Sequence, residues 1–247
     1  MTTAAPEDQL RLLSLQALDT RLQQLAHSRR THPTLARIAE LDKQIADLHG
    51  SLVDSRTAVS DLERELAKAE ADVAQVVARA AKDQQRLDSG ALGAKDALAV
   101  SDELTSLGRR QSALEEVELE VMERLEAHQE SLGKVEAAHQ ELVDARTAAE
   151  AARDAAFADL DGQAAALAAE RAGAVGGIDA ALVALYDQVR TRLGGTGAAA
   201  LRGGRCEGCG LELNPGDLAA ARAAAADQVV RCEECGRILV RVAEAAA

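Results

Sequence analysis

The sequence predicts a mainly α-helical protein, in which a long antiparallel coiled-coil hairpin is followed by a small C-terminal β domain. Aromatic residues make up only 1% of the chain, with one Phe, one Tyr and no Trp, so little material is available for a thick globular core. Apolar residues recur in heptads over residues 34–88, which is typical of a coiled coil. All four cysteines lie near the C-terminus in two Cys-x-x-Cys pairs, which indicates a separate small domain.

The first two predicted helices cover residues 7–30 and 34–88, with a proline between them that interrupts the helical pattern. The first helix is amphipathic. The second has the clearest pattern in the chain. With Ile38 as heptad position a, all its positions a and d are apolar except Ser55 and Asp83. A heptad repeat of this length indicates a left-handed coiled-coil seam.

A break at residues 89–93, which contains two glycines, predicts the turn of the hairpin. Heptads resume after the break, and the third predicted helix covers residues 98–172. Because the break is short, this helix is expected to fold back antiparallel on the second one. A tip near residue 95 would place Leu66 beside Leu125.

A glycine cluster at residues 173–177 separates the return arm from a last helix, which is expected over residues 178–193. Further glycines at 194–197 end that helix. We therefore assign residues 1–197 to the helical hairpin and residues 198–247 to the C-terminal domain.

The two cysteine pairs predict a metal site. Cys206 and Cys209 form the first pair, and Cys232 and Cys235 follow after 22 residues, with a glycine directly behind each pair. Zn²⁺ takes four ligands at tetrahedral corners, and thiolates suit it well. We therefore predict one structural Zn²⁺ held by these four cysteines, which makes the C-terminal domain a C4-type β zinc ribbon. Iron is the alternative metal, since it also accepts four thiolates.

Other interpretations of the cysteines have less support. A thioredoxin-like redox motif has one Cys-x-x-Cys beside a βαβ pattern, whereas this chain has two pairs and no such pattern. A catalytic zinc keeps an open position for water, and four cysteines fill the shell. All five histidines lie before residue 140, and no phosphate-loop or hydrolase motif occurs. We therefore expect a protein that is not an enzyme.

The net charge of −13 bears on partners and location. Residues 201–247 hold six arginines and seven acidic residues, so the first 200 residues carry nearly all the excess negative charge. An acidic helical surface repels nucleic-acid phosphates and anionic membranes, and it favours protein partners. No segment resembles a signal peptide or a transmembrane helix. We therefore expect a cytoplasmic protein. An antiparallel hairpin satisfies its own seam, which allows a monomer, whereas arginines at seam positions of the weaker stretch would equally suit the contact of a homodimer.

Residues 178–240 resemble the bacterial C4-type zinc-ribbon family. The resemblance rests on the region of Tyr186, on the residues around Cys206, and on the string Cys-Gly-Arg-Ile-Leu that begins at Cys235. It implies a long N-terminal helical hairpin, zinc ligands at the four cysteines and no enzymatic activity. Family members are described as nucleic-acid-binding or adaptor proteins, and some are linked to transcription factors, to secretion or flagellar export, or to messenger RNA.

Two functions follow from these observations. The first is a zinc-binding adaptor or scaffold that binds proteins through its coiled coil and ribbon, in transcription or secretion-related regulation. The second is a regulator that binds RNA or DNA through the ribbon. Interspersed acids and the lack of an aromatic residue for base stacking weaken the second hypothesis. Its candidate phosphate contacts are Arg202, Arg205, Arg222, Arg231, Arg237 and Arg241.

Overall fold

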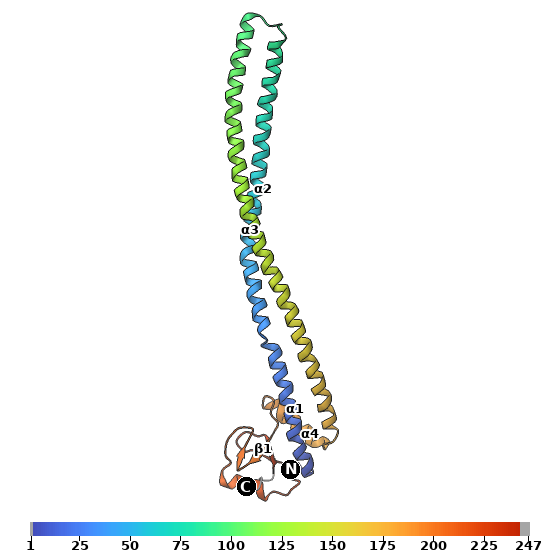
Figure 1. The fold of residues 1–247 in the computed structure, drawn as a ribbon. Coiled ribbons are helices and arrows are strands. Elements are labelled where there is room, and N and C mark those ends of the chain that lie inside the picture. Colours follow the sequence, from blue (N-terminus) through green and yellow to red (C-terminus); the bar gives the residue numbers. More distant parts are fainter. Residues whose placement is uncertain (1, 243–247) are drawn as a thin grey trace. The chain divides into compact units, whose positions relative to one another are not determined.

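The computed structural model describes residues 2–242 (Figure 1). It confirms the mainly α-helical class with a small C-terminal sheet, and the four long helices lie close to their expected ranges. The elements are α1 (Pro6–Arg30), α2 (Pro33–Asp88), α3 (Ala94–Val175), α4 (Ala180–Arg192), β1 (Ala198–Arg202), β2 (Arg205–Cys206), α5 (Pro215–Ala223), β3 (Val230–Arg231) and β4 (Ile238–Arg241).

The chain divides into two compact units. One comprises residues 36–150, and the other comprises residues up to 35 together with those from 151 onward. The boundary expected after residue 197 stays a prediction, and residues 243–247 of the predicted ribbon lie outside the described part. Among residues 2–242, no helix is both long enough and apolar enough to cross a bilayer.

The unit of residues 36–150 has the expected coiled-coil seam. Every buried side chain of α2 occupies a predicted heptad position a or d, including the polar exception Asp83. Asp83 is paired with Arg86 at 3.1 Å and lies 3.9 Å from Arg79, so the buried carboxylate has two cationic partners. The buried residues of α2 are Ile38, Leu41, Leu52, Val59, Leu62, Ala69, Val76 and Asp83.

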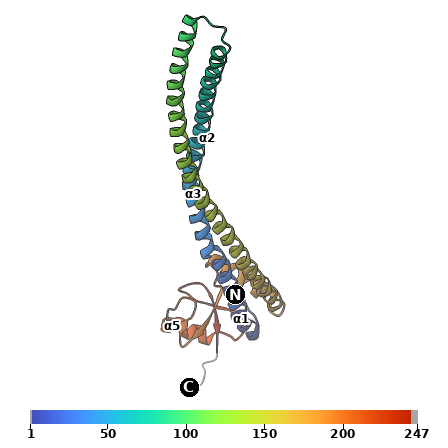
Figure 2. The same cartoon turned by 45° about the horizontal axis from the view of Figure 1, so that its top comes forward.

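Ion pairs between α2 and α3 show that the two arms run antiparallel (Figure 2). As the residue number rises along α2, the number of its partner on α3 falls, which is the signature of a hairpin. Leu66 and Leu125 line the same groove, as the expected register requires. The ion pairs are Arg56 with Glu136 at 2.8 Å, Glu65 with Arg124 at 3.4 Å, and Arg79 with Glu103 at 2.9 Å.

Truncation of a seam residue tests this packing. Leu62 is 5% exposed and Val53 is 47% exposed on the same helix. We expect Leu62→Ala to lower the free energy of unfolding by about 2–5 kcal/mol, because it leaves a cavity in the seam. Val53→Ala should change it by less than about 0.5 kcal/mol. Urea unfolding followed by helical circular dichroism measures both, and equal losses would refute the predicted seam.

In the other unit, α1 lies antiparallel to the last part of α3. Arg29 pairs with Asp161 at 3.0 Å, and Asp19 pairs with Arg171 at 2.7 Å. The chain's one phenylalanine, Phe157, lies below the Arg29 guanidinium, which is 4.5 Å from the ring centroid. α1 therefore pairs with α3 in the same antiparallel sense as α2 does.

The C-terminal sheet has strand order β2-β1-β4-β3, in which only the central β1–β4 pair is parallel. Its two faces are buried in different cores. Ala198, Ile238 and Val240 pack against α1 and α4, whereas Ala199 and Leu239 face α5 and the cysteines. Burial on both faces explains why these strands are continuously apolar instead of alternating.

The first residues of the chain also pair with the ribbon. The Ala4 amide donates to the Asp227 carbonyl at 2.8 Å, and the Val229 amide donates to the Thr2 carbonyl at 3.1 Å. The ribbon is therefore held by α1, α4 and the N-terminal segment as well as by its own sheet.

Candidate metal centre

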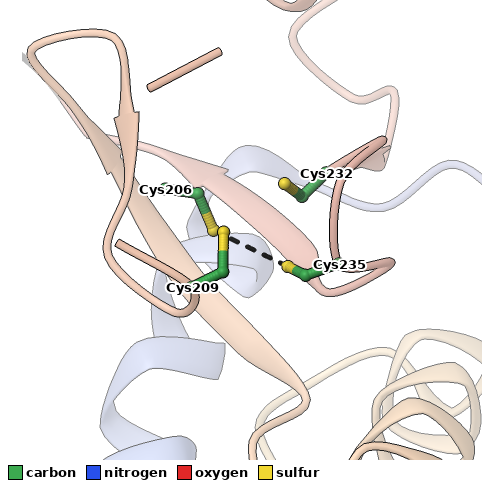
Figure 3. A group of neighbouring side chains, drawn as sticks. All are labelled: Cys206, Cys209, Cys232 and Cys235. Carbon is green, nitrogen blue, oxygen red and sulfur yellow. Dashed lines mark hydrogen bonds between the residues drawn. The ribbon is translucent and has the colours of Figure 1, made fainter. Parts of the chain in front are cut away.

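The four cysteines converge on one point between the two Cys-x-x-Cys turns (Figure 3). Their Sγ atoms all lie within 4.8 Å of one another, and those of Cys206 and Cys235 are 4.0 Å apart. A tetrahedral Zn²⁺ with Zn–S bonds of about 2.3 Å needs sulfur atoms about 3.8 Å apart. Cys206 and Cys232 are buried, and Cys209 and Cys235 are half-buried. The four thiols therefore fit a closed structural Zn²⁺ site.

The two Cys-x-x-Cys turns have the same pattern of backbone hydrogen bonds. In each turn this pattern directs both cysteine sulfurs toward the metal site. In each turn the first cysteine's amide donates to the carbonyl five residues later, and its carbonyl accepts from the glycine amide. Both glycines have positive φ, +76° and +74°, a conformation that strains other residues. The bonds are Cys206 N to Leu211 O at 3.0 Å, Cys232 N to Arg237 O at 2.9 Å, Gly210 N to Cys206 O at 2.8 Å and Gly236 N to Cys232 O at 2.7 Å.

Burial and hydrogen bonding shift the pKa values of the thiols in opposite directions. Burial raises the pKa of Cys206 to about 12, and burial also raises the pKa of Cys232. Burial is the largest single effect on Cys235 and acts in the same direction, but hydrogen bonds from Arg237, Cys232 and Cys209 together outweigh it and lower the pKa of Cys235 to about 7. Because zinc binds thiolates, its binding at neutral pH displaces protons from the buried pair.

Comparison with known proteins identifies the two parts of the chain. A family model described as CT398-like coiled coil hairpin domain matches residues 15–194, and a C4-type zinc ribbon domain matches residues 205–239. The chain belongs to the CT398-like hairpin family. It is a zinc-binding coiled-coil protein with one structural Zn²⁺, as the cysteine spacing and the resemblance predicted.

The relatives of this CT398-like protein match it over nearly its whole length. The uncharacterized protein Rv2229c of Mycobacterium tuberculosis is 37% identical over 240 residues, which is 97% of each chain. A solved structure from Mycobacterium smegmatis is 38% identical with a TM-score of 0.86, covering 98% of this chain and 100% of the other. CT398 from Chlamydia trachomatis is 17% identical with a TM-score of 0.66, covering 96% and 98%, and it supports the fold alone.

The candidate arginines of the ribbon contact groups of their own chain. Two are in ion pairs with nearby glutamates, three donate to backbone carbonyls, and Arg222 lines a groove together with Arg241. These contacts occupy guanidinium donors that would otherwise be available to a phosphate, which weakens the case for nucleic-acid binding. The nucleic-acid role stays a prediction. The contacts are Arg202 with Glu207 at 3.3 Å, Arg205 with Glu212 at 3.1 Å, Arg231 to Gly236 O at 2.9 Å, Arg237 to Thr196 O at 3.2 Å and Arg241 to Ala224 O at 2.7 Å.

A buried ionic cluster between α1, α3 and α4 was not predicted from the sequence. The Asp19 side chain is only 2% exposed, and its carboxylate accepts hydrogen bonds from Arg171 Nε and the Tyr186 hydroxyl, each at 2.7 Å. Arg190 Nε lies 3.5 Å from the same carboxylate. One signal was available, because Asp19 lies on the helical face of the buried residues Leu12 and Leu15.

Gln16 connects this cluster to the start of the ribbon. Its Oε1 accepts from the Gly197 amide at 2.7 Å and from the Tyr186 hydroxyl at 3.2 Å, and its Nε2 donates to the Gly195 carbonyl at 3.1 Å. A Cβ at Gly197 would lie 2.8 Å from the Tyr186 ring, so this close approach needs glycine. The same side chains therefore fix α1, α4 and the first residue before β1.

The phenol of Tyr186 is expected to ionise only far above its ordinary range. Burial raises the pKa of Tyr186, and the hydrogen bond to Asp19 acts in the same direction. The unfolded state, with a tyrosine pKa of about 10, then loses its proton first, so stability falls as the pH rises above about 10. Tyr186→Phe should remove this dependence.

Phenolate absorbance measures the titration directly, because the chain has one tyrosine and no tryptophan. We expect the absorbance to rise only when the protein unfolds. The unperturbed pKa of tyrosine is about 10. A titration near that pH in the folded protein would show that the cluster does not protect Tyr186.

Proposed function

We propose that this protein is a non-enzymatic cytoplasmic adaptor, which binds protein partners through its helical hairpin and its zinc ribbon. We assign it to transcription or secretion-related regulation, with a monomer or a homodimer as the binding unit. The observation that carries the proposal is the placement of exposed apolar side chains. Nine large apolar side chains of residues 2–242 are exposed to solvent, and six of them lie within residues 36–150. These six are Val53, Val77, Leu98, Val117, Leu119 and Met122.

These side chains have no role in the seam, which α2 and α3 complete between themselves. Exposed apolar residues that form a contiguous patch mark protein-interaction sites, and Leu119 and Met122 are neighbours one turn apart on α3. The charge of −13 and the engaged ribbon arginines support a protein partner more than a nucleic acid. Four cysteines in the metal site leave no open position for a catalytic water.

Lysine-directed cross-linking in cells tests the proposal sharply, because all five lysines lie within residues 36–150. The full zinc-loaded chain should yield a reproducible protein cross-linked to the hairpin, and nuclease treatment should leave that product unchanged. Recovery of nucleic acid alone, released by salt and without hairpin cross-links, would instead favour the ribbon arginines. The lysines are Lys43, Lys68, Lys82, Lys95 and Lys134.

A further inference from the structure

One exposed apolar surface of the hairpin is better defined than the others. Leu66 of α2 and Leu119, Met122 and Leu125 of α3 line a shallow groove of about 290 Å³, which we call the mid-hairpin groove. Leu119 is 56% exposed and Met122 is 48% exposed. Residues three apart on a helix are neighbours, so these two side chains stand next to each other above the half-buried leucines.

The groove has an acidic border. Residues 61–72 and 115–126, which flank it on the two arms, hold eleven acidic and three basic side chains. Glu123 and Glu126 line the groove itself, and within residues 2–242 neither is in an ion pair. Uncompensated carboxylates beside exposed apolar groups favour an occupant that supplies both positive charge and apolar surface.

We propose that the mid-hairpin groove binds an amphipathic helix of a partner protein whose apolar face is bordered by lysine or arginine. An apolar helix face in a hydrophobic groove is a common mode of peptide recognition, and the flexible Met122 thioether suits it. This proposal rests on the adaptor function and specifies its partner. A second copy of the chain would bring glutamate against glutamate, and an anionic membrane would be repelled in the same way.

Met122 provides a local probe, since it is the one methionine besides Met1. The zinc-loaded full chain is labelled with ¹³C at the methionine methyl groups, and Met122→Leu assigns the signal. The ligands are a designed amphipathic helical peptide of leucine and lysine, and a matched peptide with glutamate in place of lysine. We expect the lysine peptide to shift the Met122 signal and the glutamate peptide to leave it unchanged.

Charge reversal then tests the border. Glu123→Lys/Glu126→Lys should weaken binding of the lysine peptide by about tenfold or more, because two rim charges change from attraction to repulsion. The control Asp54→Lys/Glu141→Lys makes the same change in net charge at exposed positions. Glu141 lies about 22 Å along the helix from Glu126, well beyond a Debye length of about 8 Å at physiological salt. Binding by this control should be unchanged.

Three results would overturn the proposal: a Met122 signal that the lysine peptide does not move, equal weakening in both double variants, or a Met122 signal that shifts with protein concentration alone. The last would identify a second copy as the occupant. If a cellular protein cross-links equally to the unaltered chain and to Glu123→Arg/Glu126→Arg, which adds no reactive lysine, the adaptor function stands and the groove is not its site.

Discussion

Replacement of Cys232 by serine is expected to release the zinc and unfold the ribbon, while residues 36–150 stay helical. Cys232 is buried, and it belongs to the core of the sheet face that contains the cysteines. Structural zinc contributes about 10–16 kcal/mol in small zinc-dependent domains, which matches or exceeds the whole stability of a typical domain. The α2–α3 seam contains none of the four cysteines and should keep its ion pairs and buried leucines.

The measurements are zinc per chain by elemental analysis, limited proteolysis and helical circular dichroism. The metal analysis also distinguishes zinc from iron. Glu234→Gln is the matched control, because Glu234 lies between the same two cysteines and is exposed. It should keep one zinc and a protease-resistant ribbon. A Cys232→Ser protein with full zinc and an intact ribbon would remove these cysteines from the metal site.

The coiled coil could be predicted because its pattern is local and repetitive. The residues of α2 that the structure buries all lie at positions a and d counted from Ile38, including the unfavourable Asp83. The register in which α1 pairs with α3 could not be found in the same way, because the facing part of α3 is rich in alanine and its heptads are weak. Ion pairs such as Arg29 with Asp161 depend on a register that no short-range pattern specifies.

The ribbon was predicted through its chemistry and not through its strands. Two Cys-x-x-Cys pairs indicate a zinc site in any fold that brings the four cysteines together. In contrast, β2 and β3 have two residues each, which is too short to show a periodic pattern of apolar residues. The helix α5 between the pairs was missed, although Asn214 caps it by accepting from the Asp217 amide at 2.9 Å and Pro215 opens it. An Asn at the N-cap followed by Pro at the first helical position is a recognisable helix-start signal.

Loss of Asp19 should be among the most damaging single changes outside the zinc site. Asp19→Ala removes the buried carboxylate that accepts from Arg171 and Tyr186. The two partly buried guanidinium groups of Arg171 and Arg190 then keep only the more exposed Asp187 as a carboxylate partner. Removing one member of a buried pair typically costs about 3–5 kcal/mol, because the remaining charge stays desolvated. We expect a loss of about 3 kcal/mol, since Arg171 and Arg190 keep some exposure to water.

Urea unfolding of the zinc-loaded protein measures this loss, with zinc content recorded in parallel. Asp61→Ala is the control, because Asp61 also pairs with an arginine but is well exposed, and its loss should cost less than about 1 kcal/mol. Asp19→Asn keeps the shape of the side chain and one acceptor oxygen but removes the charge. The loss of stability that Asp19→Asn shows would therefore be the part due to charge. If Asp19→Ala keeps its zinc but loses stability, the cluster holds the ribbon against α1 and α4 independently of the metal. If Asp19→Ala and Asp61→Ala lose equally little, Gln16 and the apolar core hold that junction without the ionic cluster.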